Sequence, residues 1–182
     1  MAGGPKPPMN TPPLDKLLAV VVVDSENMRT LLGQMLHGIG VRKIRYFNDP
    51  AEALEALPEI SADFIIAKLS MEPMSGLEFV RRLRRADNLH VGTIPVIMVT
   101  VEAGVREIIA ARDVGINEFL ATPIAPQALH DRIVALIEQP RPFIKADRYV
   151  GPDRRRRTGS YSGQERRNGR KSAAKAPAAT EA

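Results

Sequence analysis

Runs of apolar residues alternate along this chain with segments in which apolar residues recur every three or four positions. An apolar run is typical of a strand buried on both faces, and the longer spacing is typical of a helix with one buried face. These patterns predict five strands, at residues 17–23, 41–47, 64–68, 94–100 and 118–121. They also predict five helices, at residues 26–38, 50–57, 76–85, 103–114 and 127–138.

The regular alternation of strands and helices predicts an α/β fold. Because strand-helix-strand crossovers are right-handed and join parallel strands, the five strands should form one parallel sheet with helices on both faces. We expect the flavodoxin-like strand order, which places a crevice at the carboxyl ends of the first and third strands. The helix after the third strand is expected to expose its four arginines, Arg81, Arg82, Arg84 and Arg85.

The amino-acid composition limits the classes of protein to which this chain can belong. The 182 residues suit one domain with a tail. The absence of cysteine excludes disulfides and thiolate chemistry and favours a cytoplasmic protein, and no apolar run approaches the roughly 18 residues of a membrane span. We expect a disordered Pro-rich leader at 1–13, a domain at 14–139 and a flexible basic tail at 140–182.

The net charge of +5 is divided unevenly. Residues 140–182 contain 12 basic and 4 acidic side chains, whereas residues 1–139 contain 14 basic and 17 acidic ones. A mildly acidic domain therefore precedes a strongly basic tail.

Lys68 is unusual because it places a cation at the carboxyl end of a buried strand, where ligands gather in open α/β sheets. The chain around it resembles the receiver domain of response regulators, the CheY-like family, over residues 14–139. Four motifs in the same order carry the resemblance: Val21-Val22-Val23-Asp24-Ser25-Glu26-Asn27-Met28-Arg29, Met71-Glu72-Pro73-Met74-Ser75-Gly76-Leu77-Glu78-Phe79, Pro95-Val96-Ile97-Met98-Val99-Thr100 and Phe119-Leu120-Ala121-Thr122-Pro123.

In that family, two acids at the end of the first strand hold Mg²⁺ and an aspartate ending the third strand accepts a phosphoryl group. A Ser or Thr ends the fourth strand and a Lys ends the fifth, and the cations neutralise charge on the phosphoryl oxygens. This chain keeps Asp24 and Thr100 but has Val23, Lys68 and Thr122 at the other three positions. The resemblance therefore implies a degenerate receiver, for which neither Mg²⁺ nor enzymatic activity is expected.

Two arrangements of Lys68 remain open. Its ammonium group forms an ion pair with Asp24 that fills the metal site, or it extends to solvent and blocks the site. Thr100 is expected to cap the following helix. The family also implies a cis peptide bond before Pro123.

A receiver that is still phosphorylated in a phosphorelay, on another acid, is the alternative. The nearest acids in the sequence are Asp63 and Glu72. Asp63 begins the third strand and Glu72 lies a turn beyond it, so neither is expected to suit the pocket.

The tail contains a repeat with a spacing of twelve residues. Tyr149-Val150-Gly151-Pro152-Asp153-Arg154-Arg155 recurs as Tyr161-Ser162-Gly163-Gln164-Glu165-Arg166-Arg167. A tail that only carries charge has no reason to repeat an aromatic residue, a glycine and an acid at fixed offsets. We therefore expect a ligand to bind at the repeated side chains, Tyr149, Asp153, Arg154, Arg155, Tyr161, Glu165, Arg166 and Arg167.

The repeated residue types suit guanine nucleotides. Arginine can bind the O6/N7 edge of guanine and stack on the base, an acid can accept from N1 and N2, and tyrosine offers a stacking face. Two copies match the two guanines and two phosphates of cyclic di-GMP. The layout resembles the arginine-rich extension of CheY-like cyclic di-GMP effectors. The alternatives are a tail that holds nucleic acid or anionic lipid by charge alone, a protein-docking tail, and a tail without a role.

These inferences describe a cytoplasmic, non-enzymatic adaptor in bacterial signal transduction. By the same resemblance, a signalling partner would dock on the face made by the fourth helix, fifth strand and fifth helix. Four residues represent this face, although in this sequence they could equally belong to the core: Val105, Ile109, Glu118 and Phe119.

Overall fold

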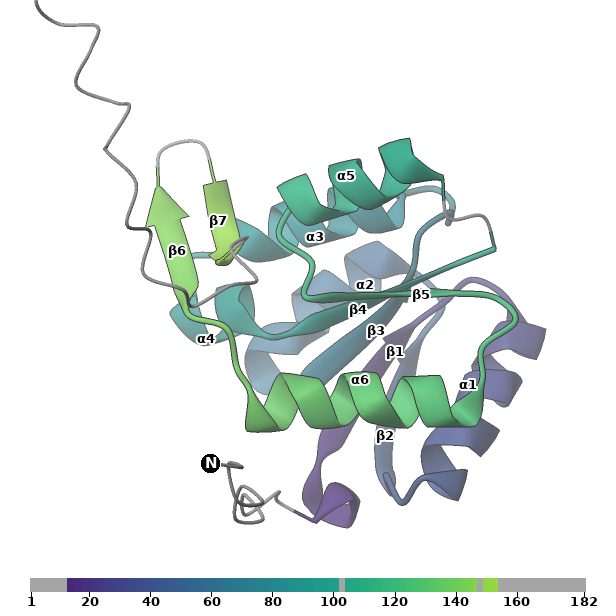
Figure 1. The fold of residues 1–182 in the computed structure, drawn as a ribbon. Coiled ribbons are helices and arrows are strands. Elements are labelled where there is room, and N and C mark those ends of the chain that lie inside the picture. Colours follow the sequence, from purple (N-terminus) through teal and green to yellow (C-terminus); the bar gives the residue numbers. More distant parts are fainter. Residues whose placement is uncertain (1–12, 102–103, 147–148, 154–182) are drawn as a thin grey trace, which may run out of the picture.

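Five parallel strands form the centre of the molecule. The computed structural model describes residues 13–101, 104–146 and 149–153. The strands of the sheet are β1 (Leu18–Val22), β2 (Lys43–Phe47), β3 (Phe64–Lys68), β4 (Val96–Thr100) and β5 (Glu118–Ala121). Their order is β2-β1-β3-β4-β5, which confirms the predicted flavodoxin-like arrangement (Figure 1).

Helices cover both faces of the sheet (Figure 1). On one face lie α1 (Glu26–Gly38) and α6 (Pro126–Glu138), and the 3₁₀ turn η1 (Leu14–Lys16) packs at the same side. The other face is covered by α2 (Pro50–Ala56), η2 (Leu57–Glu59), α3 (Gly76–Arg84), α4 (Leu89–Thr93) and α5 (Val105–Asp113). Because successive strand residues point to opposite faces, Val20 packs in one core and Val21 in the other.

Side-chain caps fix where α1, α2 and α3 begin. The Ser25 Oγ accepts from the Met28 amide at 3.4 Å, and the Ser75 Oγ accepts from the Glu78 amide at 3.3 Å. Asp49 accepts from the Ala51 amide at 2.7 Å, ahead of a proline in the first turn of α2. The short helix α4 was not predicted, because five residues are too few to show a periodic pattern.

Gly76 allows α3 to start directly against the end of β3. A Cβ atom at this position would collide with the carbonyl oxygen of Lys68 and lie 2.9 Å from the Met98 sulfur. The close crossing holds the backbone of Lys68 in place at the carboxyl edge of the sheet.

A two-stranded antiparallel hairpin follows the domain. Its strands are β6 (Phe143–Ala146) and β7 (Tyr149–Pro152), which lie beside the ends of α3 and α5 (Figure 1). The hairpin differs from the expectation of a flexible tail from residue 140. Two features attach it: Arg141 donates to the Asn117 carbonyl and the Glu118 carboxylate, and Gly151 packs against Gly115.

Arg84 lies under this hairpin, so the prediction that it faces solvent is wrong. Its side chain is buried and donates to the carbonyl groups of Gly92, Ile94 and Gly115 and to the Asn117 side chain. The guanidinium carbon also lies 4.8 Å from the ring centre of Phe143. Burial lowers the pKa of Arg84 to about 9, with the neighbouring Tyr149 opposing the shift, so the group stays charged at neutral pH.

Within the part of the chain that the structure describes, every helix is too short or too polar to cross a bilayer.

Candidate functional site

Four predicted site residues lie at the carboxyl edge of the sheet, and we call this group the strand-end site: Asp24, Lys68, Thr100 and Thr122. Lys68 is the last residue of β3 and Thr100 the last of β4, while Asp24 and Thr122 follow β1 and β5. Parallel strands end at the same edge, which is why residues far apart in sequence meet here.

Lys68 and Asp24 form an ion pair, as in the first of the two predicted arrangements, and the expectation that the pair fills a metal site stays a prediction. The Lys68 Nζ donates to the Asp24 Oδ1 at 2.7 Å. The Lys68 side chain is 21% exposed and that of Asp24 is 31% exposed. The pair is therefore partly shielded from water rather than extended into it.

The two threonines are joined through their backbones. The Thr122 amide donates to the Thr100 carbonyl at 2.8 Å, and the peptide bond between Thr122 and Pro123 is cis, as the resemblance implied. Thr100 is buried. The prediction that it caps the next helix is wrong, because α5 starts at Val105 and its N-cap residue is Gly104.

The side chains at the end of β1 do not fit a Mg²⁺ site. Val23 is fully buried in the core beneath α1 and α6 and supplies no oxygen ligand. The Asp24 carboxylate is bound by an ammonium group, which brings positive charge to the place where a cation would bind. Mg²⁺ requires oxygen ligands in octahedral geometry, and this combination does not offer them.

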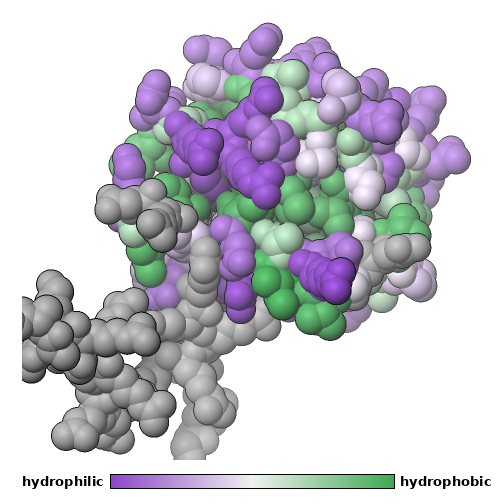
Figure 2. Space-filling model, turned by 90° about the horizontal axis from the view of Figure 1, so that it is seen from above, coloured by the Kyte–Doolittle hydropathy of each residue, from purple (hydrophilic) through white to green (hydrophobic). Residues whose placement is uncertain are grey.

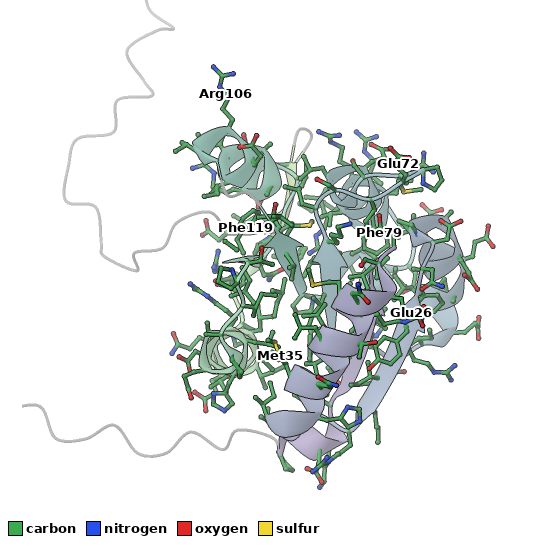
Figure 3. The ribbon with its side chains drawn as sticks, turned by 90° about the vertical axis from the view of Figure 1, so that its right-hand side faces the viewer. Glu26, Met35, Glu72, Phe79, Arg106 and Phe119 are labelled. Atoms are coloured by element: carbon green, nitrogen blue, oxygen red, sulfur yellow. The ribbon has the colours of Figure 1, made fainter. Side chains whose placement is uncertain are left out.

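Two acids that were not predicted as site residues line cavities at the strand-end site. Glu72, which Figure 3 labels at the rim of the molecule, lines the same cavity of about 610 Å³ as Asp24, although it was not expected to suit the pocket. Glu107 was overlooked, and it lines both this cavity and a neighbouring one beside Lys68 and Thr100. Asp63 lies at the opposite end of β3, as expected, where it accepts from the Leu18 amide.

We expect Lys68→Ala to lower the free energy of unfolding by about 1 to 2 kcal/mol, because it removes a charged hydrogen bond from a partly shielded carboxylate. Urea denaturation of this variant, of Asp24→Ala and of the double variant measures the coupling between the two side chains. Lys43→Ala, on the exposed part of β2, serves as the control and should change stability by less than about 0.5 kcal/mol. A double variant that loses the full sum of both single losses would contradict a stabilising pair.

The predicted tail site lies only partly within the described residues. Tyr149 belongs to β7, where its hydroxyl donates to the Pro152 carbonyl at 2.6 Å. Asp153 follows β7, and its amide donates to the Pro142 carbonyl at 2.8 Å. The remaining tail residues of the prediction lie outside the described residues: Arg154, Arg155, Tyr161, Glu165, Arg166 and Arg167.

Comparisons with known proteins agree with this fold. The family model of the response regulator receiver domain matches residues 19–134. The chemotaxis protein CheY1 of Helicobacter pylori strain J99 is 33% identical over 120 residues, covering 65% of this chain and 94% of the relative. The cyclic di-GMP phosphodiesterase response regulator RpfG of Xanthomonas campestris pv. campestris is 34% identical over 125 residues, which cover 66% of this chain and 32% of RpfG.

A solved structure shows the same likeness. The chemotaxis protein CheY4 of Vibrio cholerae superposes with a TM-score of 0.59 at 26% identity, covering 64% of this chain and 95% of that protein. The chain described here belongs to the response regulator receiver family.

Proposed function

We propose that this protein is a non-enzymatic, cytoplasmic signalling adaptor whose receiver domain is not switched by phosphorylation. The ion pair between Lys68 and Asp24 carries the proposal. An amine cannot form the acyl phosphate that a receiver aspartate forms, and Val23 stands where the family has the second metal-binding acid beside Asp24. The input signal must then enter elsewhere.

We place that input at the arginine-rich tail and propose cyclic di-GMP as its ligand. The repeat of an aromatic residue, a glycine, an acid and two arginines supports a ligand with two similar halves. The printed name of RpfG links one relative of the receiver domain to cyclic di-GMP, but the similarity covers only 32% of RpfG. Its phosphodiesterase activity is therefore not transferred to this chain.

The output surface in this proposal is the face of α5, β5 and α6. On α5, Val105 is 74% exposed and Ile109 is 44% exposed, so both are available to a protein partner. Figure 2 shows apolar side chains on the molecular surface among hydrophilic ones. Glu118 belongs to the interior of this face instead, where Arg132 and Arg141 bind its carboxylate.

Calorimetric titration of the full chain with cyclic di-GMP tests the ligand. We expect a dissociation constant of about 1 μM or below, lost when Arg154, Arg155, Arg166 and Arg167 are replaced with alanine. Heparin, a polyanion without bases, is the control ligand. Binding that is equally tight for heparin and falls steeply with salt would contradict guanine recognition and favour a polyanion-binding tail.

A second candidate function is a working phosphorelay receiver that uses Glu72. It is favoured by one observation, namely that Glu72 lines the cavity beside Asp24. Incubation with acetyl phosphate and Mg²⁺, followed by intact mass spectrometry, separates the two candidates. We expect no mass increase, whereas an adduct of about 80 Da that is lost in Glu72→Gln would establish the second candidate.

A further inference from the structure

A cavity between α5, β5 and the hairpin shares no lining residue with the cavities at the strand-end site. We call it the hairpin cavity. It has a volume of about 320 Å³, and its lining includes Ile108, Ile116, Asn117, Phe119, Arg141 and Tyr149. Ligand sites in proteins have volumes of roughly 300 to 1,000 Å³, so this cavity has room for a ligand with one or two rings.

The hairpin supplies one wall of this cavity. Tyr149 and Pro152 belong to β7, and Arg141 ties the chain before the hairpin to β5 through its bonds to the Asn117 carbonyl and the Glu118 carboxylate. The family model ends at residue 134, so this wall lies beyond the matched receiver.

The side chain of Asn117 carries hydrogen-bond donors that no described residue binds. Asn117 is only 7% exposed. Its Oδ1 accepts from the Val96 amide at 3.0 Å and from the Arg84 Nη2 at 3.3 Å, and two donors to one atom identify that atom as the oxygen. Every fully buried polar side-chain atom in the described residues has a partner, so the Nδ2 group of Asn117 keeps accessible surface. Because Asn117 lines the hairpin cavity, a ligand there can accept from this group.

The positive charge of Arg84 lies behind the Asn117 amide. Arg84 is 4% exposed, and its hydrogen-bond partners are three carbonyl groups and the Asn117 oxygen, with no carboxylate among them in the described part of the chain. A buried charge without a counter-ion is costly, and nearby dipoles must stabilise it. The Asn117 amide points its oxygen at this charge, which polarises the amide and strengthens Nδ2 as a donor.

Two arginines bring further donors to the cavity. Arg141 makes both of its bonds through Nη2, at 2.9 Å to the Asn117 carbonyl and 2.6 Å to Glu118, which leaves its Nε and Nη1 groups for a ligand. The Arg112 side chain is 57% exposed, and its contact with the adjacent Asp113 is loose at 3.3 Å. Both guanidinium groups belong to residues that line the cavity.

The charges around the cavity favour an anion. Glu118 does not oppose one, because its two oxygens are bound by Arg132 at 2.8 Å and by Arg141 at 2.6 Å. We counted the described charged side chains that line the cavity or bind a lining side chain. They are four arginines, Arg84, Arg112, Arg132 and Arg141, and two acids, Asp113 and Glu118. The balance is positive, so a carboxylate in the cavity would be stabilised.

The remaining lining is apolar and partly aromatic. Ile108, Ile116 and Phe119 give apolar surface, and Phe119 and Tyr149 each present a flat ring. The Tyr149 hydroxyl donates to the Pro152 carbonyl at 2.6 Å, which holds its ring in the wall. Flat apolar surfaces of this kind suit an aromatic ring system.

From these contacts we infer that the hairpin cavity binds a small aromatic monocarboxylate. The carboxylate accepts from the Nδ2 group of Asn117 and from Arg141 and Arg112, and the ring lies against Ile116 and Phe119. The inference goes beyond the proposed function and depends neither on the tail nor on cyclic di-GMP. Ile108 lines the cavity one turn from the exposed Val105 on α5, so an occupied cavity borders the proposed partner surface.

NMR titration of the full chain, with labelled isoleucine methyl groups, tests the inference. The probes are benzoate, with one ring, and 2-naphthoate, with two. At least one should shift the methyl signals of Ile108 and Ile116 in a saturable way, with a dissociation constant below about 1 mM. Benzamide, which has the ring without the charge, and acetate, which has the charge without the ring, should each bind at least about tenfold more weakly. Unshifted signals with both aromatic carboxylates, or equal binding of benzamide, would overturn the inference.

Three variants locate the binding groups. Asn117→Asp keeps an acceptor for Arg84 and Val96 but replaces the donor group with a negative oxygen, so it should weaken binding of the tighter probe at least about tenfold. Ile108→Trp fills the cavity from α5 and should have the same effect even if the first variant does not fold. Arg106→Ala is the matched control, because Arg106 extends from the outer side of α5 into solvent (Figure 3), and it should change affinity by less than about twofold. Unchanged affinity in a folded Ile108→Trp variant would show that the probe binds elsewhere.

Discussion

Replacing Arg84 with alanine is expected to lower the free energy of unfolding by about 3 to 5 kcal/mol, most of the stability of a marginal domain. The side chain is only 4% exposed and makes four hydrogen bonds, at 3.0 Å to Gly115, 2.9 Å to Gly92, 2.8 Å to Ile94 and 3.3 Å to Asn117. Alanine would remove the arginine donor from the three carbonyl groups, leave the Asn117 oxygen with only the Val96 amide, and open a cavity under Phe143.

Two further variants sharpen this test. Arg84→Lys keeps the charge, but one ammonium group cannot reach acceptors that surround a planar guanidinium, so we expect it to be nearly as destabilising. The neighbouring Arg85 is exposed, and Arg85→Ala should change stability by less than about 0.5 kcal/mol. Urea denaturation followed by circular dichroism measures all three. A loss below about 1 kcal/mol in Arg84→Ala would show that the buried guanidinium is dispensable.

Restoring the phosphorylation site of a receiver is expected to have the second large effect. The variant with Val23→Asp, Lys68→Asp and Thr122→Lys should change from no phosphorylation to nearly complete phosphorylation in acetyl phosphate and Mg²⁺. Asp24 and Thr100 already lie at the carboxyl ends of β1 and β4. Replacing Lys68 breaks the ion pair, so that the Asp24 carboxylate can act as an oxygen ligand for Mg²⁺. The backbone that presents position 68 is set by the crossing of Gly76 and need not change.

The measurement is intact mass spectrometry, with an added mass of about 80 Da as the expected result. The matched control carries Lys68→Asn with the same two other substitutions, and it has no carboxylate to accept the phosphoryl group. Because Val23 is fully buried, the circular dichroism spectrum must first show that the variant is folded. A folded variant without an adduct would mean that more than these three positions separates the chain from a working receiver.

Much of the domain could be predicted from local patterns. Buried strands such as β1 and β3 are apolar on both faces, and the helices between them show the spacing and caps of amphipathic helices. The flavodoxin-like strand order was expected for this alternation of strands and helices, and the structure confirms it. The pairing of Lys68 with Asp24 was one of two predicted arrangements, because both residues end adjacent strands.

The hairpin could not be predicted in the same way. Pro140 and Pro142 interrupt the pattern before it, and its exposed strand β6 has little apolar surface of its own. Its stability comes from contacts with distant residues, namely Gly115 and the buried Arg84. The position of Arg84 on α3 suggested that its side chain faces solvent. A long side chain at the end of a helix can instead turn inward and bind carbonyl groups whose location the sequence does not reveal.

Glu118 is another residue whose environment could not be predicted from the sequence. The sequence left it open whether this residue belongs to a partner surface or to the core. The structure buries it, and its charge is balanced by two arginines that lie 14 and 23 residues further along the chain. Only tertiary structure brings Arg132 and Arg141 to the same carboxylate.

The two outer strands of the sheet restrict how other chains can associate with it. β2 exposes the positive charges of Lys43 and Arg45, which repel a second copy of the same edge. β5 is only four residues long, and its first residue, Glu118, is held by two arginines. Both edges therefore resist β-augmentation and amyloid-like stacking, so that recognition by a partner is directed to helical surfaces.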